Sequence, residues 1–153
     1  PPVIGAKMAR PEAEVWAIVG DGGFQMTQAE LSTAAQEGVK VNVAVINNGY
    51  LGMVRQWQEF FYDRRYAATP LRSPDFVKIA EAHGLLGLRV EKRPDVEGIV
   101  EQARKAEGTV LIDFRVEQED SVYPMVPAGA DLDAMIRRPQ QTSVLVETAA
   151  DQI

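Results

Sequence analysis

The sequence predicts an α/β fold, in which a parallel β-sheet carries helices on both faces. Short apolar runs rich in β-branched residues recur along the chain, and stretches with helix start and stop residues separate them. A chain of 153 residues with 46% hydrophobic and 25% charged residues is long enough to bury one core. Alternation of this kind is typical of strand–helix–strand units with right-handed crossovers.

The first such unit joins a strand at residues 15–19 to a strand at residues 41–46. Between them, Thr27 and Glu30 match a capping box, in which each side chain bonds a backbone amide at the start of a helix. Gly38 closes that helix. A right-handed crossover then brings the carboxyl ends of both strands to one edge of the sheet.

The rest of the chain continues the alternation. A helix is expected over residues 51–61, followed by an arginine-rich connection over residues 62–72. Ser73 and Pro74 start the next helix, with the serine as cap and the proline at the first helical position, and Gly84 ends it. Three further elements follow: a strand at 87–90, a helix at 94–106 and a strand at 109–116.

Two segments are expected along the chain. Residues 1–136 form one domain, and residues 137–153 form a C-terminal tail that lacks hydrophobic periodicity and is expected to be disordered. The chain opens on Pro1 in what resembles the middle of a fold, so we expect an N-terminally truncated piece of a longer protein.

Composition excludes several classes of partner. A net charge of −6 without a basic stripe argues against nucleic acid, because nothing would neutralise the phosphates. Because there is no cysteine, disulfides and thiolate metal sites are excluded. No apolar run approaches the roughly 20 residues of a membrane span, so no membrane partner is expected.

Polar residues end the first two predicted strands. Asp21 follows the first strand within the segment Gly20–Gly23, and Asn48 follows the second. Neighbouring strands lie about 4.8 Å apart. Oxygens from both strand ends could therefore reach one octahedral magnesium ion, which takes its ligands at roughly 2.0–2.1 Å. Gly22 and Gly23 would let backbone amides approach phosphate oxygens. The pattern predicts a divalent metal that holds a diphosphate.

Other phosphate-binding motifs do not match. The sequence has no GxxxxGK[ST], and the dinucleotide pattern GxGxxG fails because Gln25 occupies the place of the last glycine. The alternative is an ordinary strand–helix turn with glycine and Asx chemistry. A carboxylate and an amide at this spacing favour the metal site.

The GDG and NN pair resembles the thiamine diphosphate signature. Within that superfamily, three segments resemble the large, catalytic subunit of acetolactate synthase, also called acetohydroxyacid synthase: residues 20–27, 49–58 and 122–136. The likeness covers residues 2–136. It implies a Rossmann-like, thiamine diphosphate-binding fold for that stretch.

The resemblance also implies site residues. Asp21, Asn48 and the main-chain oxygen of Tyr50 would bind Mg²⁺. Backbone amides around four residues would face the diphosphate: Gly22, Gly23, Leu51 and Gly52. The full cofactor-binding set is Gly20, Asp21, Gly22, Gly23, Asn48, Tyr50, Leu51, Gly52 and Met53.

The helix predicted over residues 51–61 has two interpretations. The resemblance places Met53 beneath the cofactor, and Val54 and Trp57 along the substrate approach. Alternatively, Met53, Val54, Trp57 and Phe61 fall at helical spacing and could form a core stripe.

The implied reaction is the decarboxylation of pyruvate and its condensation with a second pyruvate or with 2-ketobutyrate, in branched-chain amino acid biosynthesis. The cofactors would be thiamine diphosphate and Mg²⁺, with FAD bound outside this chain. No catalytic acid or base is expected here, because the activating glutamate of the family belongs to another domain, so this piece alone would be inactive. A homodimer or larger oligomer, a regulatory small subunit, and a cytoplasmic or organellar location complete the expectation.

Two alternatives remain at this stage. The first is another thiamine diphosphate enzyme, namely a pyruvate oxidase, a 2-ketoacid decarboxylase or a glyoxylate carboligase, against which Trp57 and Val54 argue. The second is a noncatalytic Rossmann-like binding module.

Five other polar residues are interpreted without a catalytic role. His83 ends a helix, where its side chain suits the helix dipole. Arg64 and Arg65 are expected on a solvated face. Asp113 and Asp120 have no partner at metal-ligand spacing, so surface or loop positions are expected for both.

Overall fold

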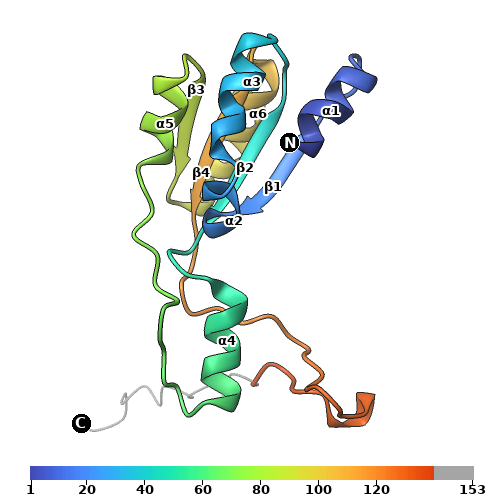
Figure 1. The fold of residues 1–153 in the computed structure, drawn as a ribbon, viewed down its shortest axis with the longest axis vertical. Helices are drawn as coiled ribbons and strands as arrows, with labels where there is room; N and C mark the ends of the chain where they lie inside the picture. Colours follow the sequence, from blue (N-terminus) through green and yellow to red (C-terminus); the bar gives the residue numbers. More distant parts are fainter. Residues whose placement is uncertain (140–153) are drawn as a thin grey trace, which may run out of the picture. The chain divides into compact units, whose positions relative to one another are not determined.

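The structure is a computed structural model that describes residues 1–139. The chain divides into two compact units, the first formed by Pro1–Asp120 and the second beginning at Ser121. The first unit contains the sheet and the helices around it (Figure 1).

Four parallel strands form the sheet, in the order β1-β2-β4-β3. Their bounds are β1 Trp16–Gly20, β2 Asn42–Asn47, β3 Leu86–Val90 and β4 Val110–Arg115. Gly20 pairs with Ile46, Ile46 with Phe114, and Phe114 with Val90, so all four carboxyl ends lie at one edge. The predicted parallel sheet is therefore confirmed.

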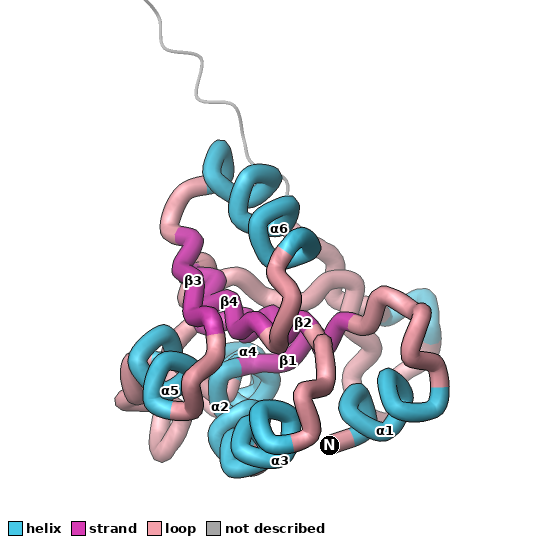
Figure 2. Tube along the Cα trace, turned by 90° about the horizontal axis from the view of Figure 1, so that it is seen from above, coloured by secondary structure: helices cyan, strands magenta, loops and turns pink. Residues whose placement is uncertain are grey.

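Helices cover both faces of this sheet, as predicted. The α-helices are α1 Pro2–Ala9, α2 Asp21–Gln25, α3 Leu31–Gln36, α4 Gly52–Phe61, α5 Phe76–Ala82 and α6 Val96–Lys105, with 3₁₀ turns η1 Gln28–Glu30, η2 Arg93–Asp95 and η3 Leu132–Ala134. Figure 2 shows α3 and α5 on one face and α6 on the other. The chain steps outward from β1 to β2 and β3, then returns to β4, so right-handed crossovers place α6 on the opposite face.

The core has two parts, one on each face of the sheet. Phe24 and Phe76 belong to the larger part and meet edge to face, with ring centroids 5.4 Å apart. Leu111 of β4 points into this part, whereas its neighbours Val110 and Ile112 belong to the smaller part under α6. β4 is therefore buried on both faces, which is typical of a central parallel strand.

The predicted capping box is wrong. Thr27 makes no side-chain cap bond, and the 3₁₀ turn η1 separates it from α3, which begins at Leu31. The Glu30 carboxylate instead accepts a hydrogen bond from Thr33 Oγ1 at 3.0 Å, so it does not reach back to Thr27. Gly38 follows the helix with a φ of 59°, a conformation that glycine adopts without strain.

The predicted start of α5 is wrong by two residues. Asp75 caps this helix, because its Oδ1 accepts hydrogen bonds from the amides of Val77 at 3.1 Å and Lys78 at 3.3 Å. Ser73, the predicted cap, lies before the helix and bonds Asp21.

The second unit is described only through Pro139. Met125 and Ile136 form an antiparallel bridge, with N–O distances of 2.9 and 2.7 Å. Within residues 1–139, no helix is long and apolar enough to cross a membrane. The predicted boundary after residue 136 stays a prediction, and residues 140–153 of the predicted tail lie outside the described part.

Candidate functional site

The carboxyl edge of β1 and β2 borders a cavity of about 480 Å³. Asp21 follows β1 directly and opens α2, and Asn48 follows β2 directly. The cavity lining includes all nine residues predicted to bind the cofactor, together with Ile46 and Val54: Gly20, Asp21, Gly22, Gly23, Ile46, Asn48, Tyr50, Leu51, Gly52, Met53 and Val54. The structure therefore brings together residues that lie up to 34 positions apart, as counted from Gly20 to Val54.

The Asp21 side chain is buried, with 1% of its surface exposed. Ser73 Oγ donates a hydrogen bond to Asp21 Oδ2 at 2.9 Å. Gln25 Nε2 supports both partners, because it lies 3.3 Å from Ser73 Oγ and 3.3 Å from the Asp21 carbonyl oxygen. No ion pair involves Asp21 within residues 1–139.

The turn after β2 is held in place from two sides. Asn48 Oδ1 accepts a hydrogen bond from the Tyr50 amide at 3.0 Å, which forms an Asx turn around Gly49, whose φ is 71°. The connection after α4 pairs with the same turn, through Leu51 N–Thr69 O at 2.8 Å and Leu71 N–Gly49 O at 2.7 Å. Both contacts fix the position of Asn48 and of the Tyr50 carbonyl group.

One amide in the stretch predicted to face a diphosphate has a partner within the chain. The Leu51 amide donates to the Thr69 carbonyl oxygen. The residue that forms the pairing lies 18 positions later, so no local pattern indicates it. Leu51 lines the cavity without offering its amide.

Two glycines of the cavity lie close to neighbouring side chains. A Cβ atom at Gly52 would lie 2.9 Å from Asn48 Nδ2, and one at Gly22 would lie 2.8 Å from Leu51 Cδ2. Glycine at position 52 therefore lets the Asn48 carboxamide lie against the start of α4.

The outer face of α4 borders a second cavity of about 740 Å³, lined by Met53, Val54, Trp57, Gln58, Tyr62 and Arg65. The side chains of Met53, Val54, Trp57 and Phe61 are 40–52% exposed in the described structure. Trp57 and Phe61 meet edge to face at 5.5 Å. The alternative of a core stripe on this helix is therefore wrong for these residues, while their predicted substrate role stays a prediction.

Arg55 occupies the buried face of α4 and was missed at the level of sequence. Its guanidinium lies 5.3 Å from the ring centroid of Tyr50 and 4.8 Å from that of Tyr66, and it pairs with Glu59 at 3.0 Å. Burial and the nearby Glu59 carboxylate both raise the pKa of Tyr66, which stays neutral. The sequence held one signal of this ion pair, because Arg55 and Glu59 lie four residues apart and therefore on the same side of a helix.

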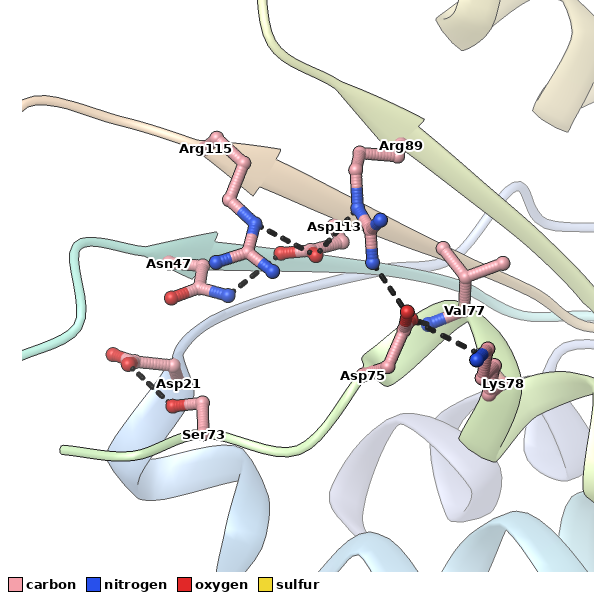
Figure 3. Close-up of polar contacts among 9 residues, drawn as sticks. All are labelled: Asp21, Asn47, Ser73, Asp75, Val77, Lys78, Arg89, Asp113 and Arg115. Carbon is pink, nitrogen blue, oxygen red and sulfur yellow. Dashed lines mark hydrogen bonds and ion pairs between the residues drawn. The ribbon is translucent and has the colours of Figure 1, made fainter.

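The position of Asp113 differs from the prediction. It is completely buried within β4 rather than in a surface or loop position. Its Oδ1 accepts from Asn47 Nδ2 at 2.8 Å, and its Oδ2 accepts from Arg89 Nε at 3.1 Å and Arg115 Nε at 3.0 Å (Figure 3). These partners come from three strands, so sequence spacing could not group them.

Arg89 links this carboxylate to the start of α5. Its guanidinium also donates to Asp75 Oδ1 at 2.6 Å. Burial opposes ionisation of Asp75, but the Lys78 amide and the Arg89 charge outweigh it and lower the pKa of Asp75. Burial likewise opposes the charge on Arg89, yet the two aspartates raise the pKa of Arg89.

The remaining polar residues are not brought to the cavity. His83 caps the end of α5, and its Nδ1 lies 3.1 Å from Ser32 Oγ. Arg64, Arg65 and Asp120 are exposed. They do not line the cavity between the ends of β1 and β2.

The donors at this cavity suit a hard divalent cation. Within the described residues, no group of three or more His, Cys, Asp or Glu side chains could hold a metal. The cavity instead offers one buried carboxylate, one carboxamide oxygen and a turn carbonyl. Mg²⁺ is commonly bound in this way, by one or two carboxylates plus phosphate oxygens and water. The residues therefore fit a magnesium ion whose coordination a phosphate ligand completes.

Comparisons with known proteins agree with this geometry. The chain is similar to acetolactate synthase of Mycobacterium leprae, with 57% identity over 139 residues that cover 87% of this chain and 22% of that protein. It is 44% identical over 136 residues to the mitochondrial acetolactate synthase catalytic subunit of Saccharomyces cerevisiae, covering 89% of this chain and 20% of that protein. The chain spans about a fifth of the length of these curated relatives.

A solved structure shares the fold. The thiamine diphosphate-dependent 4-hydroxybenzoylformate decarboxylase of Rhodococcus jostii RHA1 matches with a TM-score of 0.72 and 28% identity, over 78% of this chain and 23% of that one. Residues 1–114 match the family described as "Thiamine pyrophosphate enzyme, C-terminal TPP binding domain". This chain therefore belongs to the family of C-terminal TPP-binding domains of thiamine pyrophosphate enzymes.

Proposed function

We propose that this chain is the diphosphate-binding part of an acetolactate synthase. That enzyme would decarboxylate pyruvate and condense the product with a second pyruvate or with 2-ketobutyrate, in branched-chain amino acid biosynthesis. Identities of 44–57% to acetolactate synthases support this choice. The observation that carries it is the single cavity that Asp21, Asn48 and Tyr50 line together.

Three oxygen donors would hold Mg²⁺ in this cavity. They are the Asp21 carboxylate, Asn48 Oδ1 and the Tyr50 carbonyl oxygen. Asp21 is buried without an ion pair among the described residues, and an isolated buried charge is costly unless a cation compensates it. The Asx turn leaves Asn48 Oδ1 with capacity for a second partner.

The glycines would bind the diphosphate. Gly22 and Gly23 lie in the first turn of α2, where amides have no acceptor within the helix, and Gly52 begins α4. Gly20 and the Leu51 side chain complete the wall of the cavity, and Met53 would support the cofactor from below.

The residues of this chain would bind and orient the cofactor rather than transfer protons. Thiamine diphosphate supplies the carbanion chemistry when it is bound. Val54 and Trp57 would border the approach of the second ketoacid, because both line the 740 Å³ cavity beside Met53. The activating glutamate and an FAD site would lie in other domains, and a homodimer or larger oligomer, with a regulatory small subunit, would complete the enzyme in the cytoplasm or an organelle.

Product analysis tests the proposal. The full-length protein, supplied with pyruvate, thiamine diphosphate and Mg²⁺, is expected to form 2-acetolactate, and Asp21→Ala is expected to form none. Acetaldehyde or acetyl phosphate without 2-acetolactate would show a decarboxylase or an oxidase instead. With pyruvate and 2-ketobutyrate in competition, Trp57→Leu is expected to lower the share of the 2-ketobutyrate product, whereas Phe61→Leu, one helical turn away, should not.

A binding experiment separates the enzyme from a noncatalytic module. Calorimetry should show that the wild-type protein binds thiamine diphosphate only when Mg²⁺ is present, and that Asp21→Ala binds it far more weakly. Equal binding by both proteins would favour the noncatalytic module.

A further inference from the structure

Each strand end that carries a proposed metal ligand is supported by a side chain from a distant part of the chain. Ser73, from the connection before α5, donates to Asp21 Oδ2 at 2.9 Å. Asp113, from β4, accepts from Asn47 Nδ2 at 2.8 Å, and Asn47 directly precedes the ligand Asn48. Neither Ser73 nor Asp113 is itself a proposed metal ligand.

The backbone of residues 73–75 joins the Ser73 hydrogen bond to the ion pairs of Arg89, so the two supports lie at the ends of one path. Ser73 lies two residues before Asp75, which caps α5. Arg89 donates to Asp75 at 2.6 Å and to Asp113 at 3.1 Å. Figure 3 shows the resulting path, from Asp21 through Ser73 and the start of α5 to Arg89, Asp113 and Asn47.

The ion-pair part of this path, which does not include Asp21, is balanced in charge without a metal ion. It holds two carboxylates, Asp75 and Asp113, and two guanidiniums, Arg89 and Arg115. Asp113 is fully buried, so its geometry is restricted by packing as well as by its three donors. Ion pairs that are balanced around one buried carboxylate can hold the strand ends in place before any cation arrives.

The Asn47 carboxamide is fixed in one orientation. Its nitrogen donates to Asp113, while its Oδ1 is buried and has no hydrogen-bond partner among the described residues. Leaving a buried amide oxygen without a donor costs free energy. The bond to Asp113 therefore fixes which way the Asn47 carboxamide faces, while the backbone ladder to β4 holds the end of β2.

We propose that Ser73 and Asp113 are positioning residues of the metal site, coupled through Arg89 and Asp75. Ser73 orients the Asp21 carboxylate, and Asp113 orients the Asn47–Asn48 end of β2. This inference rests on the proposed function, because it requires a cation at Asp21 and Asn48. Supporting residues of this kind typically change metal affinity by 10–100-fold when they are removed.

Mn²⁺ binding to the full-length protein, followed by electron paramagnetic resonance at saturating thiamine diphosphate, tests the role of Ser73. Ser73→Ala is expected to weaken Mn²⁺ binding by about 10-fold. Ser73→Thr keeps the hydroxyl group and is expected to retain most of the affinity. Ser32→Ala is the matched control, because it also removes one serine hydroxyl bond, the one to His83, away from the site.

The role of Asp113 is tested in the same assay. Asp113→Asn is expected to weaken Mn²⁺ binding by about 10-fold or more, because the neutral asparagine removes the charge that pairs with both arginines and leaves one acceptor oxygen for three donors. Arg115→Gln removes one partner and takes the place of Asp113→Asn if that variant does not fold. The double variant with Ser73→Ala should lose less affinity than the product of the single losses, because both act through one network.

The outcomes separate this inference from the proposed function. Equal Mn²⁺ affinity of the wild type and Asp21→Ala would contradict the metal site itself. Loss of affinity in Asp21→Ala with full affinity in Ser73→Ala and in the Asp113 or Arg115 variant would overturn only the positioning network. Independent, multiplicative losses would contradict the coupling through Arg89.

Discussion

Two buried aspartates at the same edge of the sheet differ in what surrounds them. Asp113 is fully buried, yet it accepts from one amide and pairs with two arginines. Asp21 is 1% exposed, and its side-chain partner is the neutral hydroxyl of Ser73. The protein therefore compensates the charge of Asp113 with its own arginines, whereas no ion pair compensates Asp21 among the described residues, which supports the cation in the proposed function.

This difference shows how a structural carboxylate is distinguished from a ligand. Residue type and burial are the same in both, and only the partners separate them. A buried ion pair that is fully hydrogen-bonded holds a fold in one arrangement. A buried carboxylate without such a pair costs stability, and it persists where binding requires it.

The largest expected effect is on cation binding. Asp21→Asn should lower the Mn²⁺ affinity of the full-length protein by at least about 100-fold, which is beyond the usual effect of a supporting residue, because it removes the carboxylate ligand. Titration of Mn²⁺ at saturating thiamine diphosphate measures this loss. If Asp113→Asn lowered the affinity more than Asp21→Asn did, the assignment of the two aspartates would be reversed.

The next effect is on folding. Asp113→Asn should lower the free energy of unfolding by about 2–3 kcal/mol, because Arg89 and Arg115 lose their buried partner. The loss falls below the 3–5 kcal/mol typical of a broken buried pair, since the arginine side chains are 31% and 43% exposed and keep access to water. Urea unfolding of the metal-free protein measures it, and an unchanged midpoint would contradict the structural role of Asp113.

For Asp21, the opposite change in the free energy of unfolding is expected. Asp21→Asn should raise the free energy of unfolding of the metal-free protein by roughly 1 kcal/mol, because it removes an unpaired buried charge. The same urea experiment, repeated with Mg²⁺ and thiamine diphosphate, should reverse the order, since only the wild type then gains from binding. A loss of stability in the metal-free variant would contradict the interpretation of Asp21 as an uncompensated charge.

The smallest effect is the pH dependence that comes from Asp75. Its lowered pKa means that the unfolded state binds more protons near its ordinary value of 3.8, so Asp75 stabilises the fold above that pH. This contribution disappears as the pH falls through the lowered pKa of the folded state. Asp75→Asn keeps a good helix cap and removes the charge, so its unfolding free energy should fall less steeply below about pH 5. Identical pH profiles for both proteins would contradict the Asp75–Arg89 interaction.

Local patterns predicted the sheet, its parallel direction and the cavity residues Asp21, Asn48, Gly22 and Gly23, whereas Tyr50, Leu51, Gly52 and Met53 came from the family resemblance. The apolar runs before Asp21 and Asn48 and the glycines around them are signals within a few residues of the site. The supporting contacts could not be predicted, because they join distant residues such as Ser73 with Asp21 and Arg89 with Asp113. Ser73 was assigned to the helix cap for the same reason, since an N-terminal serine is a strong local signal.

The hydrogen bonds from Leu51 to Thr69 and from Leu71 to Gly49 join the Tyr50 turn to the segment that follows α4. Movement of that segment therefore displaces the Tyr50 carbonyl group. Under the proposed function, cation occupancy and the position of residues 69–71 are thermodynamically linked, so each favours the other to the same extent. Substitutions in this segment, of which Thr69 is fully buried, would then change the affinity for magnesium without altering a ligand.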